Sequence, residues 1–71
     1  MTWHRGKGLV RWELRDSLGN YLADIVRREC SKVPWCYRAW TPDNSKSTWG
    51  YVASVARAKR EAVKWLDRHV R

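Results

Sequence analysis

The apolar residues of this chain change their spacing along the sequence, and the change limits the folds open to it. Val10, Trp12 and Leu14 alternate with charged residues, which is the spacing of a strand with one buried face. Toward the carboxyl end the apolar residues instead recur at helical spacing, directly after Ser54, a good N-cap residue. The expected helical face comprises Val55, Ala58, Ala62, Trp65, Leu66 and His69. The sequence therefore predicts strands followed by one amphipathic helix.

Two turn-rich segments divide the rest of the sequence into three or four strands. Residues 16–20 contain Gly19, which can take a positive φ, and residues 42–45 begin with Pro42, whose ring fixes φ. Apolar residues of both parities, such as Tyr21 and Leu22, follow the first turn, so we expect a β-bulge or burial on both faces there. The expected strands cover residues 9–15, 21–28, 33–41 and, as a short fourth strand, 46–53.

One helix that covers one face of an antiparallel meander is the simplest two-layer arrangement of these elements. The expected fold is therefore α+β: a three- to four-stranded antiparallel meander with one C-terminal helix packed on one face, and with the second sheet face open. A chain of 71 residues has room for one domain. We place that domain at residues 9–71. Residues 1–8, with glycines on both sides of Lys7, have the composition of a flexible basic arm.

The charge balance favours a polyanionic partner. The chain has 15 Lys and Arg residues against 7 Asp and Glu residues, a formal net charge of +8. A field of that sign attracts phosphate backbones and raises encounter rates. Arginine outnumbers lysine, and its planar guanidinium binds phosphate with two parallel hydrogen bonds or stacks on a base. Nucleic acid is the expected partner, and the competing interpretation is that the charge only supplies solubility.

Several other classes of protein find no support in the sequence. The amino terminus has no apolar segment typical of a signal peptide, and no apolar run approaches the length of a transmembrane helix, so we expect a cytoplasmic protein without a membrane partner. In that compartment Cys30 and Cys36 are expected to be free, buried thiols. Their spacing fits no common zinc pattern, and no catalytic motif or phosphate loop is present. We expect no metal, no cofactor and no enzymatic activity.

Two sets of residues are the candidate nucleic-acid contacts. If Val10, Trp12 and Leu14 face the helix, their neighbours face away from it, and the same alternation applies to the third strand. The expected open-face contacts are Arg11, Arg15, Arg38 and Trp40. A second basic stripe is expected on the outer side of the helix, at Arg57, Arg60, Lys64 and Arg68. Arginine binds phosphates and guanine edges and tryptophan stacks on bases, although a solvated charged surface would have the same composition.

The chain resembles two families of small DNA-binding domains. The helix contains an Ala-Lys-Arg-Glu-Ala-x-x-Trp-Leu stretch, from Ala58 to Leu66, after antiparallel strands. In this it is similar to the amino-terminal arm-site-binding domain of tyrosine integrases and to the plant ethylene-response DNA-binding domain. In those families the sheet enters the DNA major groove, and Arg and Trp on its open face make the contacts. The resemblance therefore implies contacts from Arg11, Arg15, Arg38 and Trp40. The chain equally resembles short β-meander-plus-helix proteins of bacteriophages.

The sequence thus predicts a small, basic DNA-binding accessory protein of a phage or mobile element. A different class of function stays open. Exposed Trp and Tyr side chains are frequent anchors of protein interfaces, so a phage effector that binds and inhibits a host protein is the alternative. Six tryptophans exceed what so small a core needs, and an exposed apolar patch would also allow a homodimer.

Overall fold

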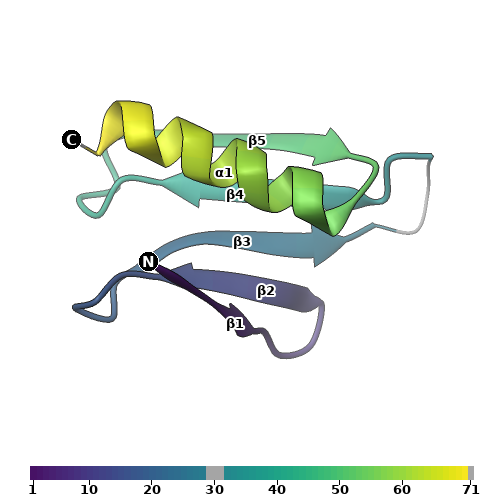
Figure 1. Ribbon diagram of the computed structural model, residues 1–71, viewed down its shortest axis with the longest axis horizontal. Coiled ribbons are helices and arrows are strands. Elements are labelled where there is room, and N and C mark those ends of the chain that lie inside the picture. The colour runs from purple at the N-terminus through teal and green to yellow at the C-terminus, as the bar shows by residue number, and fades with distance from the viewer. Residues whose placement is uncertain (29–31, 71) are drawn as a thin grey trace.

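The computed structural model describes residues 1–28 and 32–70, which form one five-stranded sheet and one helix (Figure 1). In chain order the elements are β1 (Thr2–Arg5), β2 (Val10–Arg15), β3 (Tyr21–Arg27), β4 (Trp35–Trp40), β5 (Ser47–Val52) and α1 (Val55–His69). Each strand pairs antiparallel with the next, so the spatial order equals the chain order. The α+β class and the C-terminal helix are confirmed, and the sheet has one strand more than the largest number expected.

The additional strand is β1, which lies where a flexible arm was expected. Trp3 stands opposite Leu14 in the β1–β2 register and packs against the core. The glycines around Lys7 form the hairpin turn: Val10 N donates to the Lys7 carbonyl oxygen at 3.2 Å, and Gly8 has φ of 64°. Residues 1–8 therefore belong to the sheet instead of preceding a domain that starts at residue 9.

Two register shifts set which residues of β2 and β3 face the helix. Leu14 lies opposite Ala23 but Arg15 lies opposite Tyr21, so Leu22 is the extra residue of a bulge, as the mixed parity indicated. Leu22 is 2% exposed and packs in the core. A second shift leaves Arg11 as the extra residue of β2. Because of this shift, Val10 pairs with Val26 and lies on the face opposite to that of Trp12 and Leu14. The expectation that Val10 shares a face with Trp12 and Leu14 is therefore wrong.

The helix packs on β3, β4 and β5, and alanines form much of the contact. Ala58 and Ala62 of α1 are fully buried, as are Ala23 and Ala39 of the sheet, so the helix backbone comes close to the strands. The largest fully buried side chains are Leu14, Ile25 and Leu66. The core is therefore narrow, with alanines at the helix–sheet contact beside a few larger aliphatic side chains.

Half-buried tryptophans extend this core to β1 and β2. Trp3 and Trp12 pack at its margin, and the Lys59 ammonium of α1 lies 3.7 Å from the ring centroid of Trp12. Arg5 also covers Trp12, at 5.1 Å, and Arg27 covers Trp35 at 5.7 Å. These cations contribute to the packing of the helix side.

The ends of the helix and the last strand follow from local chemistry. Ser54 is the N-cap, as expected, and its hydroxyl accepts a hydrogen bond from Arg57 N at 3.2 Å. In β5 the Tyr37 ring lies close over Gly50, because a Cβ at this position would be 2.7 Å from the Tyr37 hydroxyl oxygen. Within the described residues, no helix is long and apolar enough to cross a membrane.

Candidate nucleic-acid interface

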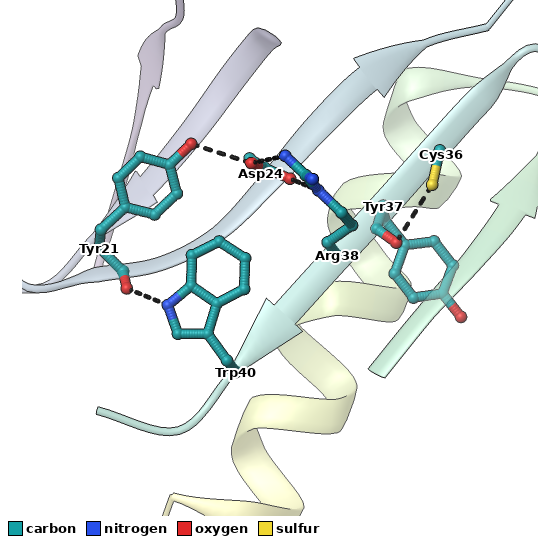
Figure 2. Close-up of polar contacts among 6 residues, drawn as sticks. All are labelled: Tyr21, Asp24, Cys36, Tyr37, Arg38 and Trp40. Carbon is teal, nitrogen blue, oxygen red and sulfur yellow. Dashed lines mark hydrogen bonds and ion pairs between the residues drawn. The ribbon is translucent and has the colours of Figure 1, made fainter. Parts of the chain in front are cut away.

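The sheet surface that α1 does not cover is named here the open face. Cross-strand pairing defines it, because residues that pair directly share a face: Glu13 pairs with Asp24, Asp24 with Arg38, and Arg38 with Trp49. Figure 2 shows part of this face across β3 and β4, with the helix behind the sheet. The open face consists of Thr2, His4, Val10, Glu13, Arg15, Tyr21, Asp24, Val26, Cys36, Arg38, Trp40, Ser47, Trp49 and Tyr51.

A buried carboxylate holds an arginine at the centre of the open face. Asp24 is 2% exposed, and it accepts a hydrogen bond from Arg38 Nε at 2.7 Å and another from Arg38 Nη2 (Figure 2). The Tyr21 hydroxyl donates to the same carboxylate at 3.0 Å. The hydrogen bonds to Asp24 raise the pKa of Arg38 above its ordinary value. Nη1 takes part in neither bond, so a fixed guanidinium keeps donors for a ligand.

The Asp24 carboxylate also changes the acidity of its tyrosine neighbour. Desolvation by burial raises the pKa of Tyr21 above its ordinary value, and the negative charge of Asp24 and the hydrogen bond to it act in the same direction. Tyr21 therefore stays a neutral donor well into alkaline solution.

Trp40 is less available than the sequence indicated. Its ring stacks on Tyr21, with centroids 5.2 Å apart and an interplanar angle of 14°. Its Nε1 donates to the Tyr21 carbonyl oxygen at 2.6 Å (Figure 2). The Arg15 guanidinium lies 5.0 Å from the centroid of the Tyr21 ring and also pairs with Glu13 at 3.3 Å. One face of the indole and its polar group are thus used inside the protein, so Trp40 mainly supports the surface.

The aromatic rings most accessible to a ligand are on β5. Trp49 is 67% exposed and Tyr51 is 45% exposed, and the two rings meet edge to face with centroids 5.7 Å apart. Sequence analysis assigned neither residue to the site. The available signal was the alternation in β5, where Trp49 and Tyr51 share one parity and Gly50, which passes under Tyr37, has the other.

The structure divides the predicted contacts between two sides of the molecule. Arg15, Arg38 and Trp40 lie together on the open face, whereas Arg11 is the exposed extra residue of the β2 bulge. The four helix residues are all exposed, on the side of α1 opposite to the buried Ala58, Ala62 and Leu66: Arg57, Arg60, Lys64 and Arg68. The two sets do not form one continuous surface.

Charge is also distributed unevenly between the two sides. On the open face Arg15 is paired with Glu13 and Arg38 with Asp24, so both arginines are largely neutralised. The outer side of α1 has the higher density of positive charge. The open face is therefore less cationic, and more aromatic, than the sequence predicted.

A groove lies between α1 and β5, on the helix side of the sheet. It has a volume of about 180 Å³. Its lining residues are Tyr37, Thr48, Glu61, Lys64, Trp65, Arg68 and His69. The His69 ring stacks on Trp65 with centroids 4.4 Å apart, and its Nδ1 is 2.9 Å from the Trp65 carbonyl oxygen. The groove thus places Lys64, Arg68 and the Glu61 carboxylate beside the aromatic rings of Tyr37 and Trp65.

The sulfur chemistry of the open face is that of a buried thiol. Cys36 is free, 4% exposed, and its pKa is raised by burial, so the expectation of a free buried thiol is confirmed for this residue. Cys30 lies outside the described residues.

Among the residues that the structure describes, no group of three or more His, Cys, Asp and Glu side chains comes together that could hold a metal ion.

Comparison with known proteins leaves the family of the chain open. No protein-family model, no curated protein and no solved structure matches it. The similarity to integrase arm-site-binding domains therefore stays a prediction, based on the order of elements and on one short helical stretch.

Proposed function

We propose that the protein binds nucleic acid through its open face. The observation that carries the proposal is the pairing of Arg38 with Trp49, on neighbouring strands and on the sheet face that α1 does not cover. A guanidinium held by a buried carboxylate lies there beside an exposed indole ring. Guanidinium groups bind phosphates and base edges, and indole rings stack on bases. The two hydrogen bonds to Asp24 hold Arg38 in position, which lowers the entropy that this side chain loses on binding.

The positive charge elsewhere on the molecule supports the same partner. The net charge is +8, while the arginines of the open face are paired with carboxylates. Long-range attraction would therefore come mainly from the outer side of α1, and the open face would supply the short-range contacts. Counterion release from about 5–8 phosphates, together with base stacking, would account for the affinity.

A salt titration tests this proposal. Fluorescence anisotropy with labelled oligonucleotides, at several salt concentrations, should give an affinity that falls steeply with salt. The expected log–log slope is about −0.9 per neutralised phosphate on duplex DNA and about −0.7 on a single strand. Absence of binding at low salt would contradict the proposal.

A second candidate function has its own supporting observation. β5 is an edge strand, and it presents two exposed aromatic rings, Trp49 and Tyr51. An edge strand can add a strand from another protein, with exposed aromatic residues as anchors. Capture from a cell lysate with and without nuclease separates the two candidates, because a protein partner would remain bound after nuclease treatment, whereas material attached through nucleic acid would be lost.

A further inference from the structure

We infer that the nucleic acid is single-stranded and crosses the edge of the sheet at β5. In this arrangement unpaired bases stack on Trp49 and Tyr51, while the phosphates reach Lys64 and Arg68 in the groove between α1 and β5. The inference rests on the proposed function and adds the class of nucleic acid and its path.

The first step concerns the aromatic rings. Trp49 and Tyr51 are the most exposed aromatic side chains of the open face, at 67% and 45%. A base can stack on such a ring only if its own flat face is free. In a duplex each base face is covered by the neighbouring base pair, whereas a single strand presents its base faces at little cost. The exposed rings therefore fit unpaired bases.

The second step concerns the position of the positive charge. Thr48 lines the groove on the helix side, and the next residue, Trp49, lies on the open face. β5 is the edge strand of the sheet and α1 lies over one of its faces (Figure 1), so the groove and the aromatic pair are on opposite faces of this strand. A duplex, with a persistence length of about 50 nm, is too stiff to bend around one strand, whereas a single strand can do so.

The third step concerns the chemistry of the groove. Lys64 and Arg68 line it together with one carboxylate, that of Glu61, so the groove keeps a positive charge. Arginine and lysine are the usual phosphate ligands of proteins. The other half of the basic stripe, Arg57 and Arg60, is equally exposed but does not line the groove. It therefore offers a control with the same change in charge.

The experiment compares a labelled oligothymidylate of about 12 nucleotides with a duplex of the same length, by anisotropy at one low salt concentration. The variants are Trp49→Ala, the double variant Lys64→Gln/Arg68→Gln, and the control double variant Arg57→Gln/Arg60→Gln. All five positions are exposed, and circular dichroism and thermal unfolding establish that each variant folds.

We expect the single strand to bind more tightly than the duplex. Trp49→Ala should weaken binding of the single strand by about tenfold, as loss of one stacked base predicts, and should leave binding of the duplex nearly unchanged. The groove variant should weaken binding of the single strand more than the control variant, although both remove two positive charges.

Three results would overturn the inference: equal affinity for duplex and single strand, an unchanged single-strand affinity in Trp49→Ala, or equal effects of the two double variants. The first and the third leave the proposed function intact if binding depends steeply on salt, whereas the second would also remove Trp49 from the contacts of the open face. Failure of both oligonucleotides to bind at low salt would instead overturn the proposed function itself.

Discussion

Asp24 is the residue that organises the open face. Its buried carboxylate accepts hydrogen bonds from Arg38 and from Tyr21, and Tyr21 in turn supports Trp40 by stacking. A buried charge is tolerated only when it is paired and hydrogen-bonded, and these contacts satisfy that condition. One carboxylate therefore fixes the positions of a guanidinium and two aromatic rings.

The tyrosine of this cluster should make stability depend on alkaline pH. The pKa of Tyr21 is raised in the folded protein, so its stabilising effect is complete below the ordinary value of 10.0 and is lost as pH rises from there toward the folded value. Urea unfolding at about pH 8 and about pH 11 should show a larger loss of stability for the wild type than for Tyr21→Phe, which has no phenol to ionise. Identical losses would show that Tyr21 does not titrate in this way.

Elements with local signals were predictable from the sequence, and those that depend on distant partners were not. The helix was predicted with its N-cap because Ser54 and the helical spacing lie within one segment. β1 was missed because its main signal is Trp3. This residue stabilises a strand only through its pairing with Leu14 and its packing on the core, and both partners are distant in the sequence. The exposure of Trp49 likewise depends on which side of β5 the helix covers. The residues of one β-strand do not specify that side.

The N-cap offers a test at the level of the helix. Ser54→Ala removes the hydroxyl that accepts from Arg57 N, and such caps contribute about 1 kcal/mol. Urea unfolding should therefore show a free energy of unfolding lower by about 1 kcal/mol for Ser54→Ala. Ser47→Ala is the matched control, because Ser47 is exposed and the structure gives its hydroxyl no hydrogen bond. If both variants lost the same stability, capping by Ser54 would contribute nothing.

At the scale of the whole molecule, stability depends on few large buried side chains. Alanines form much of the helix–sheet contact, and the tryptophans lie at its margins. A protein of this size has a net stability on the order of 4–10 kcal/mol. The close alanine contacts leave little space for neighbouring residues to refill a cavity, so each large core residue should account for a considerable part of that total.

Leu66 is the most direct test of this narrow core. It lies on α1, is 2% exposed, and belongs to the same core cluster as Leu14 and Leu22. Leu66→Ala should lower the free energy of unfolding by about 2–5 kcal/mol, which is enough to leave part of the protein unfolded near physiological temperature. Leu18→Ala is the control, because Leu18 is 85% exposed and should cost almost nothing. Thermal and urea unfolding measure both variants. A small effect at Leu66 would mean that the sheet and its half-buried tryptophans stay folded without close helix packing. Packing of α1 would then contribute little to the free energy of unfolding.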